Sequence, residues 1–213
     1  MSALSQLDWR DVRNQYDSRV RIHRQLLRFY GNGDFDQFVY LLLGISDPTG
    51  NYSADEHKLG PKILTNNRNS IDQVVGIAKK FIELKNARKV PELIREAAIQ
   101  YLKIGVGSEA SCMLNPDVCW VANTRTIWTH LVIKHADDLA KADEELRLYR
   151  SQDERSEMAY KIWAEIHREL AASMTRIAEE GERLAKAASI KPGPVRYLWA
   201  DAIANALYSS YYD

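Results

Sequence analysis

Apolar residues recur at helical spacing along most of this chain, and that pattern limits what the chain can fold into. In roughly the first 30 residues they return every three, four or seven positions, at Trp9, Val12, Tyr16, Val20, Leu27 and Tyr30. This spacing places them on one face of an amphipathic α-helix that fills about residues 8–30. A sustained alternation of apolar and polar residues, which a half-buried strand requires, is absent. The sequence therefore predicts an all-α protein.

Capping and turn residues give approximate limits for the remaining helices. Asp34, Ser70 and Asn123 are typical residues to begin a helix, and Val90-Pro91 fits a first helical turn. We expect one short helix within 51–69, another over 108–114, and further helices over 35–45, 70–82, 90–101, 124–132, 137–150, 153–188 (with a break near Gly181) and 194–212. No repeat, low-complexity tract or linker divides the chain. The prediction is a single all-α domain over residues 1–213.

Composition narrows the class of protein further. Hydrophobic residues make up 46% of the 213 residues and charged residues 27%, as in ordinary soluble domains. No apolar run approaches the roughly 20 residues of a membrane span, and the first ten residues lack the order of a secretory signal. Cys112 and Cys119 are too few for a disulfide framework or an iron–sulfur cluster. We expect a cytoplasmic, reducing location, no membrane partner and no cofactor.

Charge is balanced overall but is unevenly distributed. The 29 basic and 29 acidic residues cancel. Ten basic and four acidic residues lie between Lys58 and Lys103, whereas seven basic and thirteen acidic residues lie between Asp137 and Glu182. The first segment is suited to a polyanionic partner, although both segments also fit ordinary solvated helix faces.

The run Lys103-Ile104-Gly105-Val106-Gly107-Ser108 lies directly after the basic segment. Two glycines around an aliphatic residue predict a very tight turn between two short helices, within a hairpin element spanning 91–116. The amides that open the second helix carry partial positive charge and are suited to a phosphate oxygen. The predicted DNA-binding residues are Lys103, Gly105, Val106, Gly107 and Ser108. Such contacts hold a DNA backbone without reading its bases.

Residues 102–114 resemble the hairpin of the helix-hairpin-helix DNA glycosylases, in which a Leu-Pro-Gly-Val-Gly phrase precedes an apolar helix. Phe35–Ser46 is similar to that family's early apolar helix, and the likeness covers residues 35–135 loosely. The resemblance implies a compact helical fold, binding to duplex DNA, and hydrolytic removal of a base. It also places the family's catalytic aspartate at Asn123 and its Schiff-base lysine at Glu109. Neither residue can perform the corresponding step.

These two replacements favour DNA binding, or a diverged base-excision or lesion-recognition role, over the family's usual catalysis. Asp117 and Glu109 are the carboxylates nearest the hairpin and are the candidate general acids. Trp120 and Trp128 flank Asn123 and are candidates to stack on an extruded base. The alternative for both indoles is ordinary packing in the core.

Two other functions remain open from the sequence. Arg125 and His130 match the Arg-x4-His spacing of the HEPN ribonucleases, in which arginine stabilises a phosphorane and histidine transfers a proton. The second alternative is a non-enzymatic helical interaction protein, whose glycines serve only to pack two helices. No metal site is expected, because the five histidines lack the spacing of a helical zinc pair.

Overall fold

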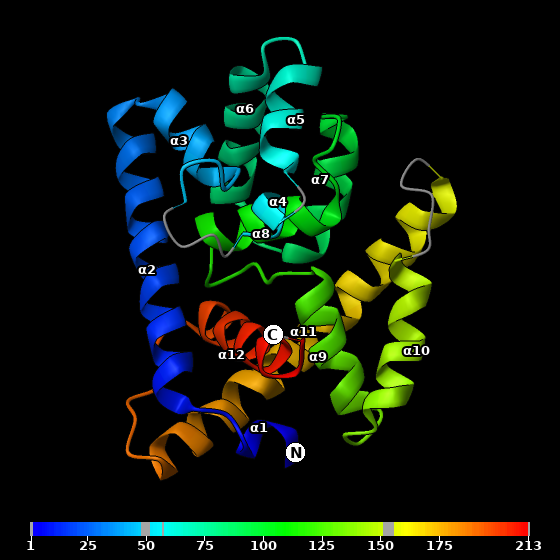
Figure 1. Cartoon of the computed structure of the whole chain (residues 1–213). Helices are drawn as coiled ribbons and strands as arrows, with labels where there is room; N and C mark the ends of the chain where they lie inside the picture. Colours follow the sequence, from blue (N-terminus) through cyan, green and yellow to red (C-terminus); the bar gives the residue numbers. More distant parts are fainter. Residues whose placement is uncertain (1, 48–51, 57, 151–155, 213) are drawn as a thin grey trace. The chain divides into compact units, whose positions relative to one another are not determined.

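The computed structural model describes residues 2–47, 52–56, 58–150 and 156–212, and in these ranges the chain is helical and contains no strand (Figure 1). The predicted all-α class is confirmed. The elements are α1 (Ser2–Ser5), α2 (Trp9–Asn32), α3 (Phe35–Leu42), α4 (Ser53–Glu56), α5 (Leu59–Asn66), α6 (Ser70–Glu83), the 3-10 turn η1 (Ala87–Lys89), α7 (Val90–Ala97), α8 (Ile104–Leu114), α9 (Thr124–Lys134), α10 (Leu139–Arg150), α11 (Glu157–Ala187) and α12 (Arg196–Tyr212).

The chain divides into two compact units. Unit 1 comprises residues 1–17 and 122–213, and unit 2 comprises residues 18–121. The first division falls inside helix α2, and the second lies in the loop between α8 and α9. Neither place has the Gly-, Pro- or Ser-rich composition of a linker. The division therefore reflects which helices pack together, and composition gives no sign of it.

Unit 1 is built on the packing of α12 against α11 and α9, with α10 against α9. Helix α12 is buried over ten consecutive residues, from Leu198 to Leu207. An aromatic group of Trp9, Tyr16 and Trp199 joins α12 to the start of the chain, with ring centroids 5.6–6.1 Å apart. Gly181 lies where α11 crosses α12, and a Cβ there would collide with Ile203. Helix α11 runs unbroken from Glu157 to Ala187, so the predicted break near Gly181 is wrong.

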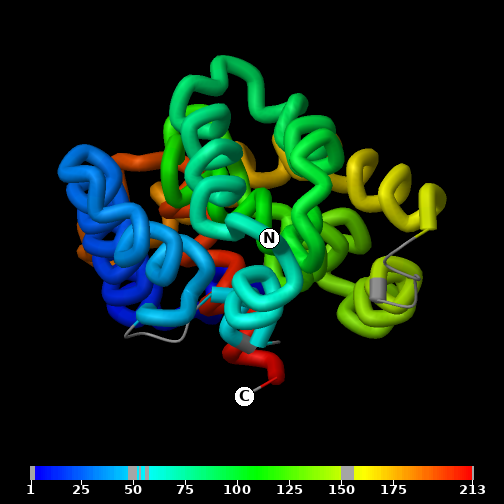
Figure 2. The backbone as a smooth tube through the Cα atoms, turned by 90° about the horizontal axis from the view of Figure 1, so that it is seen from above, coloured from blue at the N-terminus to red at the C-terminus, as the bar shows by residue number. Residues whose placement is uncertain are grey.

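Unit 2 places α6, α7 and α8 against one another, with α3 on α6 (Figure 2). The tightest approach is between α7 and α8. A Cβ on Gly107 would lie 2.7 Å from Cγ1 of the buried Ile94 on α7. Since real Cβ atoms do not approach so closely, glycine at 107 allows the two helices to come into direct contact.

Helix limits followed the sequence signals in some places and departed from them in others. The start of α7 at Val90 and the cap of α9 at Asn123 are confirmed. Helix α7 ends at Ala97 and excludes Tyr101, and two short helices, α4 and α5, replace the single one expected within 51–69. Such ends depend on contacts with other elements, because propensity alone is a weak determinant of a short helix.

Within the described residues, no helix combines the length and the apolar character that crossing a membrane requires.

We predict that Gly107→Ala destabilises the protein although alanine is the better helix former. Overpacking against Ile94 should cost about 1–3 kcal/mol and outweigh a propensity gain of about 1 kcal/mol. Gly76 is the matched control, since it lies inside α6 with nothing within 4 Å of a Cβ. Gly76→Ala should stabilise by about 0.5–1 kcal/mol. Urea unfolding measures the free energy of unfolding of both variants. Equal changes in Gly107→Ala and Gly76→Ala would contradict the close contact between Gly107 and Ile94.

Unit 1 also contains a fully buried histidine on α11. Burial, aided by the positive charge of Arg168, lowers the pKa of His167 from 6.5 to about 4. The folded state therefore binds a proton less readily than the unfolded chain does. Its contribution to stability is complete above pH 6.5 and is lost as the pH falls toward 4.

We predict that this loss amounts to about 3 kcal/mol for His167. Unfolding free energy measured between pH 7 and pH 4 should fall more steeply in the wild type than in His167→Leu, which cannot titrate. Carboxylates also titrate in this range, so the difference between the two curves isolates His167. Parallel curves would show that His167 does not couple to folding.

Candidate nucleic-acid interface

The turn between α7 and α8 lies before the two glycines. It runs from Ala98 to Lys103 and uses left-handed backbone at Ala98 (φ 49°) and Tyr101 (φ 67°). Gly105 and Gly107 lie in the first turn of α8, and neither has a positive φ. The prediction of a bend at 105–107, with a helix beginning at Ser108, is therefore wrong in position. Gly107 is needed for packing, as its approach to α7 shows.

The first turn of α8 presents main-chain donors beside a positive charge. Its first intrahelical hydrogen bond runs from Gly107 N to Lys103 O (2.7 Å), so the amides of residues 104–106 precede the helical ladder. Lys103 is the N-cap residue and is exposed, and its side chain makes no capping hydrogen bond. Gly105 is half-buried, and a Cβ there would meet no atom within 4 Å. An anion therefore has room beside Gly105.

The other hairpin residues face inward. Val106, Gly107 and Ser108 are buried, and the Ser108 hydroxyl donates a hydrogen bond to Gly105 O (3.1 Å). Among the five predicted DNA-binding residues, Lys103 is exposed and Gly105 is half-buried, and the other three are buried.

A second turn is fixed to this one by paired hydrogen bonds. Asn67, at the end of α5, donates from Nδ2 to Gln100 O (3.2 Å), and its Oδ1 accepts from Gln100 N (2.9 Å). Neither segment 58–71 nor segment 97–108 contains an acidic residue. The Lys62 ammonium also lies over the Tyr101 ring, 6.0 Å from its centroid. The two turns thus combine into one surface with positive side chains and no carboxylate of its own.

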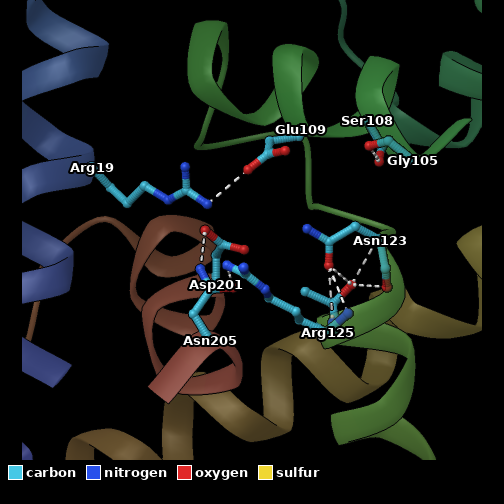
Figure 3. Close-up of polar contacts among 9 residues, drawn as sticks. Arg19, Gly105, Ser108, Glu109, Asn123, Arg125, Asp201 and Asn205 are labelled. Atoms are coloured by element: carbon cyan, nitrogen blue, oxygen red, sulfur yellow. Dashed lines mark hydrogen bonds and ion pairs between the residues drawn. The ribbon is translucent and has the colours of Figure 1, made fainter. Parts of the chain in front are cut away.

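Glu109, a candidate acid, is fully engaged inside unit 2. Its Oε1 accepts from Arg19 Nη2 at 2.7 Å, and the two side chains are 1% and 3% exposed (Figure 3). The Arg19 guanidinium also lies over the ring of Tyr52, at 5.3 Å. Burial raises the pKa of that tyrosine well above its usual value of 10. This arrangement joins α2 to α8 and is a structural ion pair.

Asn123, which the sequence resemblance aligned with a catalytic aspartate, caps a helix. Its Oδ1 accepts from the amides of Arg125 and Thr126, both at 3.1 Å, and Thr126 Oγ1 accepts from Asn123 N (3.0 Å). These reciprocal bonds form a capping box at the start of α9 (Figure 3). The side chain is 4% exposed, and its carbonyl oxygen satisfies two helical amides.

Arg125 and His130 contact different helices of unit 1. Arg125 Nη1 donates to Asn205 Oδ1 of α12 at 3.5 Å, whereas His130 Nδ1 lies 2.6 Å from Ser173 Oγ of α11. Burial lowers the pKa of His130, which favours the neutral imidazole. Arg125 and His130 lie five residues apart on α9, and their side chains contact different helices. This arrangement does not bring the guanidinium and the imidazole to one phosphate group.

The two tryptophans and Asp117 are the remaining predicted site residues. Trp120 is 5% exposed, and Trp128 is fully buried, donates from Nε1 to Asp143 Oδ1 (2.7 Å) and packs against Tyr208. Neither indole presents a ring face for stacking. Asp117 lies exposed in the loop after α8.

Burial raises the pKa of the Cys119 thiol to about 12, so it stays protonated near neutral pH and is a poor nucleophile. Among the residues described, no three His, Cys, Asp or Glu side chains are grouped to hold a metal ion.

Several buried polar residues are not among the site residues predicted from the sequence. Asp201 and Asn205 lie four residues apart on α12 and are 1% and 4% exposed, and Asn205 Nδ2 donates to Asp201 Oδ2 (3.3 Å). Two polar residues at helical spacing within an otherwise apolar, alanine-rich helix were a usable signal. The sequence gives no signal that Arg19 is buried, because arginines on amphipathic helices are usually exposed.

Comparison with protein-family models, with curated proteins and with solved structures yields no match for this chain. The likeness of residues 35–135 to the helix-hairpin-helix glycosylases therefore stays a prediction from sequence. The local geometry described above must carry any functional proposal.

We predict that Glu109→Gln destabilises the protein by about 3 kcal/mol or more, because Arg19 would keep its charge in the interior without this carboxylate. Glu182→Gln is the matched control, since Glu182 pairs with Lys186 on the surface of α11. It should cost less than about 0.5 kcal/mol. Chemical unfolding measures both losses. A double variant, Arg19→Met with Glu109→Leu, should recover most of the stability. Equal losses in Glu109→Gln and Glu182→Gln would contradict a buried pair.

Proposed function

We propose that unit 2 binds the sugar–phosphate backbone of duplex DNA through the first turn of α8. The observation that carries the proposal is the set of amides at 104–106 beside exposed Lys103, with open space at Gly105. Amides at a helix start, reinforced by the helix dipole, favour a phosphate oxygen. Such contacts do not distinguish one base sequence from another.

The electrostatics of the adjoining turn support the same ligand. Lys62 and Arg68 are exposed on or just after α5, and the paired bonds of Asn67 and Gln100 tie this turn to the one before α8. With no acidic residue in either segment, a phosphate here meets positive side chains and unopposed amides. Release of counterions from DNA would then make the affinity strongly dependent on salt.

We restrict the proposed function to binding, without base excision. Asn123 uses its side-chain oxygen on the α9 amides, and Glu109 is paired with Arg19 inside unit 2. Neither is available as a general acid or a nucleophile in this arrangement. The Arg125–His130 ribonuclease alternative gains no support, because the two residues bind different helices.

The decisive experiment places a negative charge at position 105. Gly105→Asp should leave the unfolding free energy unchanged or slightly raised, since an acid suits a helix start by about 0.3–1 kcal/mol. It should nevertheless weaken duplex binding at least tenfold at low salt, because the carboxylate occupies the position of the phosphate. Fluorescence anisotropy of a labelled duplex at two salt concentrations provides the measurement.

Two controls separate local from general effects. Gly105→Asn has the same size without the charge and should bind much better than Gly105→Asp. Asn14→Asp adds one negative charge on an exposed position of unit 1 and should change the affinity less than twofold. The proposal fails if the wild type shows no salt-dependent binding to DNA, or if Gly105→Asp binds as well as the wild type does.

A further inference from the structure

A surface pocket of about 430 Å³ lies on unit 2, and neither Lys103 nor Gly105 lines it. Helix α3 forms one wall, and the end of α5 with the start of α6 forms the other. The lining residues are Asp36, Gln37, Tyr40, Leu64, Ser70 and Ile71. This volume falls within the range of sites for small organic ligands.

The lining combines an aromatic ring, aliphatic walls and acceptor oxygens. Tyr40 is 43% exposed, so its ring is accessible to a ligand in the pocket. Leu64 and Ile71 are half-buried and line the same pocket. Asp36 contributes a carboxylate, and Gln37 contributes an amide carbonyl. The Ser70 hydroxyl donates to Leu64 O (3.1 Å) and keeps its capacity to accept.

The charged residue in the lining indicates the sign of the ligand. On the α3 side, residues 29–56 contain five acidic residues and no lysine or arginine, whereas the segment of the other wall contains Lys62 and Arg68, which do not line the pocket. None of the six lining residues is basic, and Asp72 follows directly after Ile71. The one charged group in the lining is the Asp36 carboxylate, which favours a cation over an anion.

We propose that this pocket binds a guanidinium group carried on an aliphatic stem, as in an arginine side chain or a free arginine-like amine. A guanidinium is planar, so it can stack on the Tyr40 ring and donate two parallel hydrogen bonds to the Asp36 carboxylate. Its remaining donors have Gln37 Oε1 as an acceptor. The methylene stem then lies against Leu64 and Ile71.

The probe is N-acetyl-arginine methylamide, titrated into the full chain and followed by chemical-shift changes in NMR spectra. N-acetyl-citrulline methylamide is the matched ligand, because its neutral urea has nearly the same shape as the guanidinium. Saturable binding of the arginine probe, at least tenfold tighter than that of the citrulline probe, is expected. No saturable binding, or equal binding of the two probes, overturns the proposal.

Matched variants locate the site. Asp36→Asn and Tyr40→Ala should each weaken binding of the arginine probe at least tenfold. Asp72→Asn is the control for charge, since Asp72 is also an acid in a first helical turn but does not line the pocket. Tyr211→Ala is the control for the aromatic ring, because Tyr211 is similarly exposed on unit 1. Both controls should bind as the wild type does; a loss in Asp72→Asn equal to that in Asp36→Asn would reduce the effect to diffuse attraction and overturn the proposal.

Agmatine and an arginine-containing tetrapeptide distinguish the two sources of the guanidinium. Agmatine binding as tightly as the peptide indicates a free small molecule, and a tighter peptide indicates a protein side chain. Gly105→Asp should leave all of these affinities unchanged. Its failure to weaken DNA binding would therefore overturn the proposed function without affecting the pocket.

Discussion

The close contact of α7 with α8 is the constraint on which the arrangement of unit 2 depends. Gly107 permits it, because any side chain there would displace Ile94. With α8 held this close to α7, its middle turns face the interior and Glu109 reaches Arg19 on α2. Gly105, in the first turn of α8, has free space where a Cβ would lie. The two glycines of this helix therefore differ: Gly107 is needed for packing, and Gly105 borders the candidate anion site.

Most of the polar residues that drew attention in the sequence stabilise the fold. Asn123 satisfies helical amides, Glu109 neutralises a buried guanidinium, and His130 contacts Ser173 between two helices. Buried polar groups need such partners, since leaving one unsatisfied costs about 1–3 kcal/mol. For this reason, a buried residue of a type that is suited to catalysis often has a structural role, which is to satisfy the hydrogen bonds of its neighbours. The groups left accessible to ligands lie on the surfaces of the turns.

Unit 2 carries two candidate sites with opposite preferences for charge. The acid-free turns around Asn67 and Gln100 present lysines and helix amides, which suit a phosphate. The pocket beside α3 has the Asp36 carboxylate as the one charged group in its lining, which suits a guanidinium. Net charge near zero hides this separation. A nearly neutral composition therefore argues against a strongly cationic protein, but not against local binding of an anion.

The sequence by itself determined the helical class and several helix starts, because apolar spacing, a proline in the first turn and a capping residue act within a few neighbouring positions. It also indicated Gly105 and Gly107 as exceptional, but it assigned both to a bend. Only the tertiary structure decided that Gly107 faces Ile94, that Arg19 is buried, and that α12 hides Asp201 and Asn205. Those outcomes depend on which helices pack together, and residues 90 positions apart, such as Arg19 and Glu109, give no local sign of their contact. The pocket beside α3 has the same origin, since its walls come from helices separated along the chain.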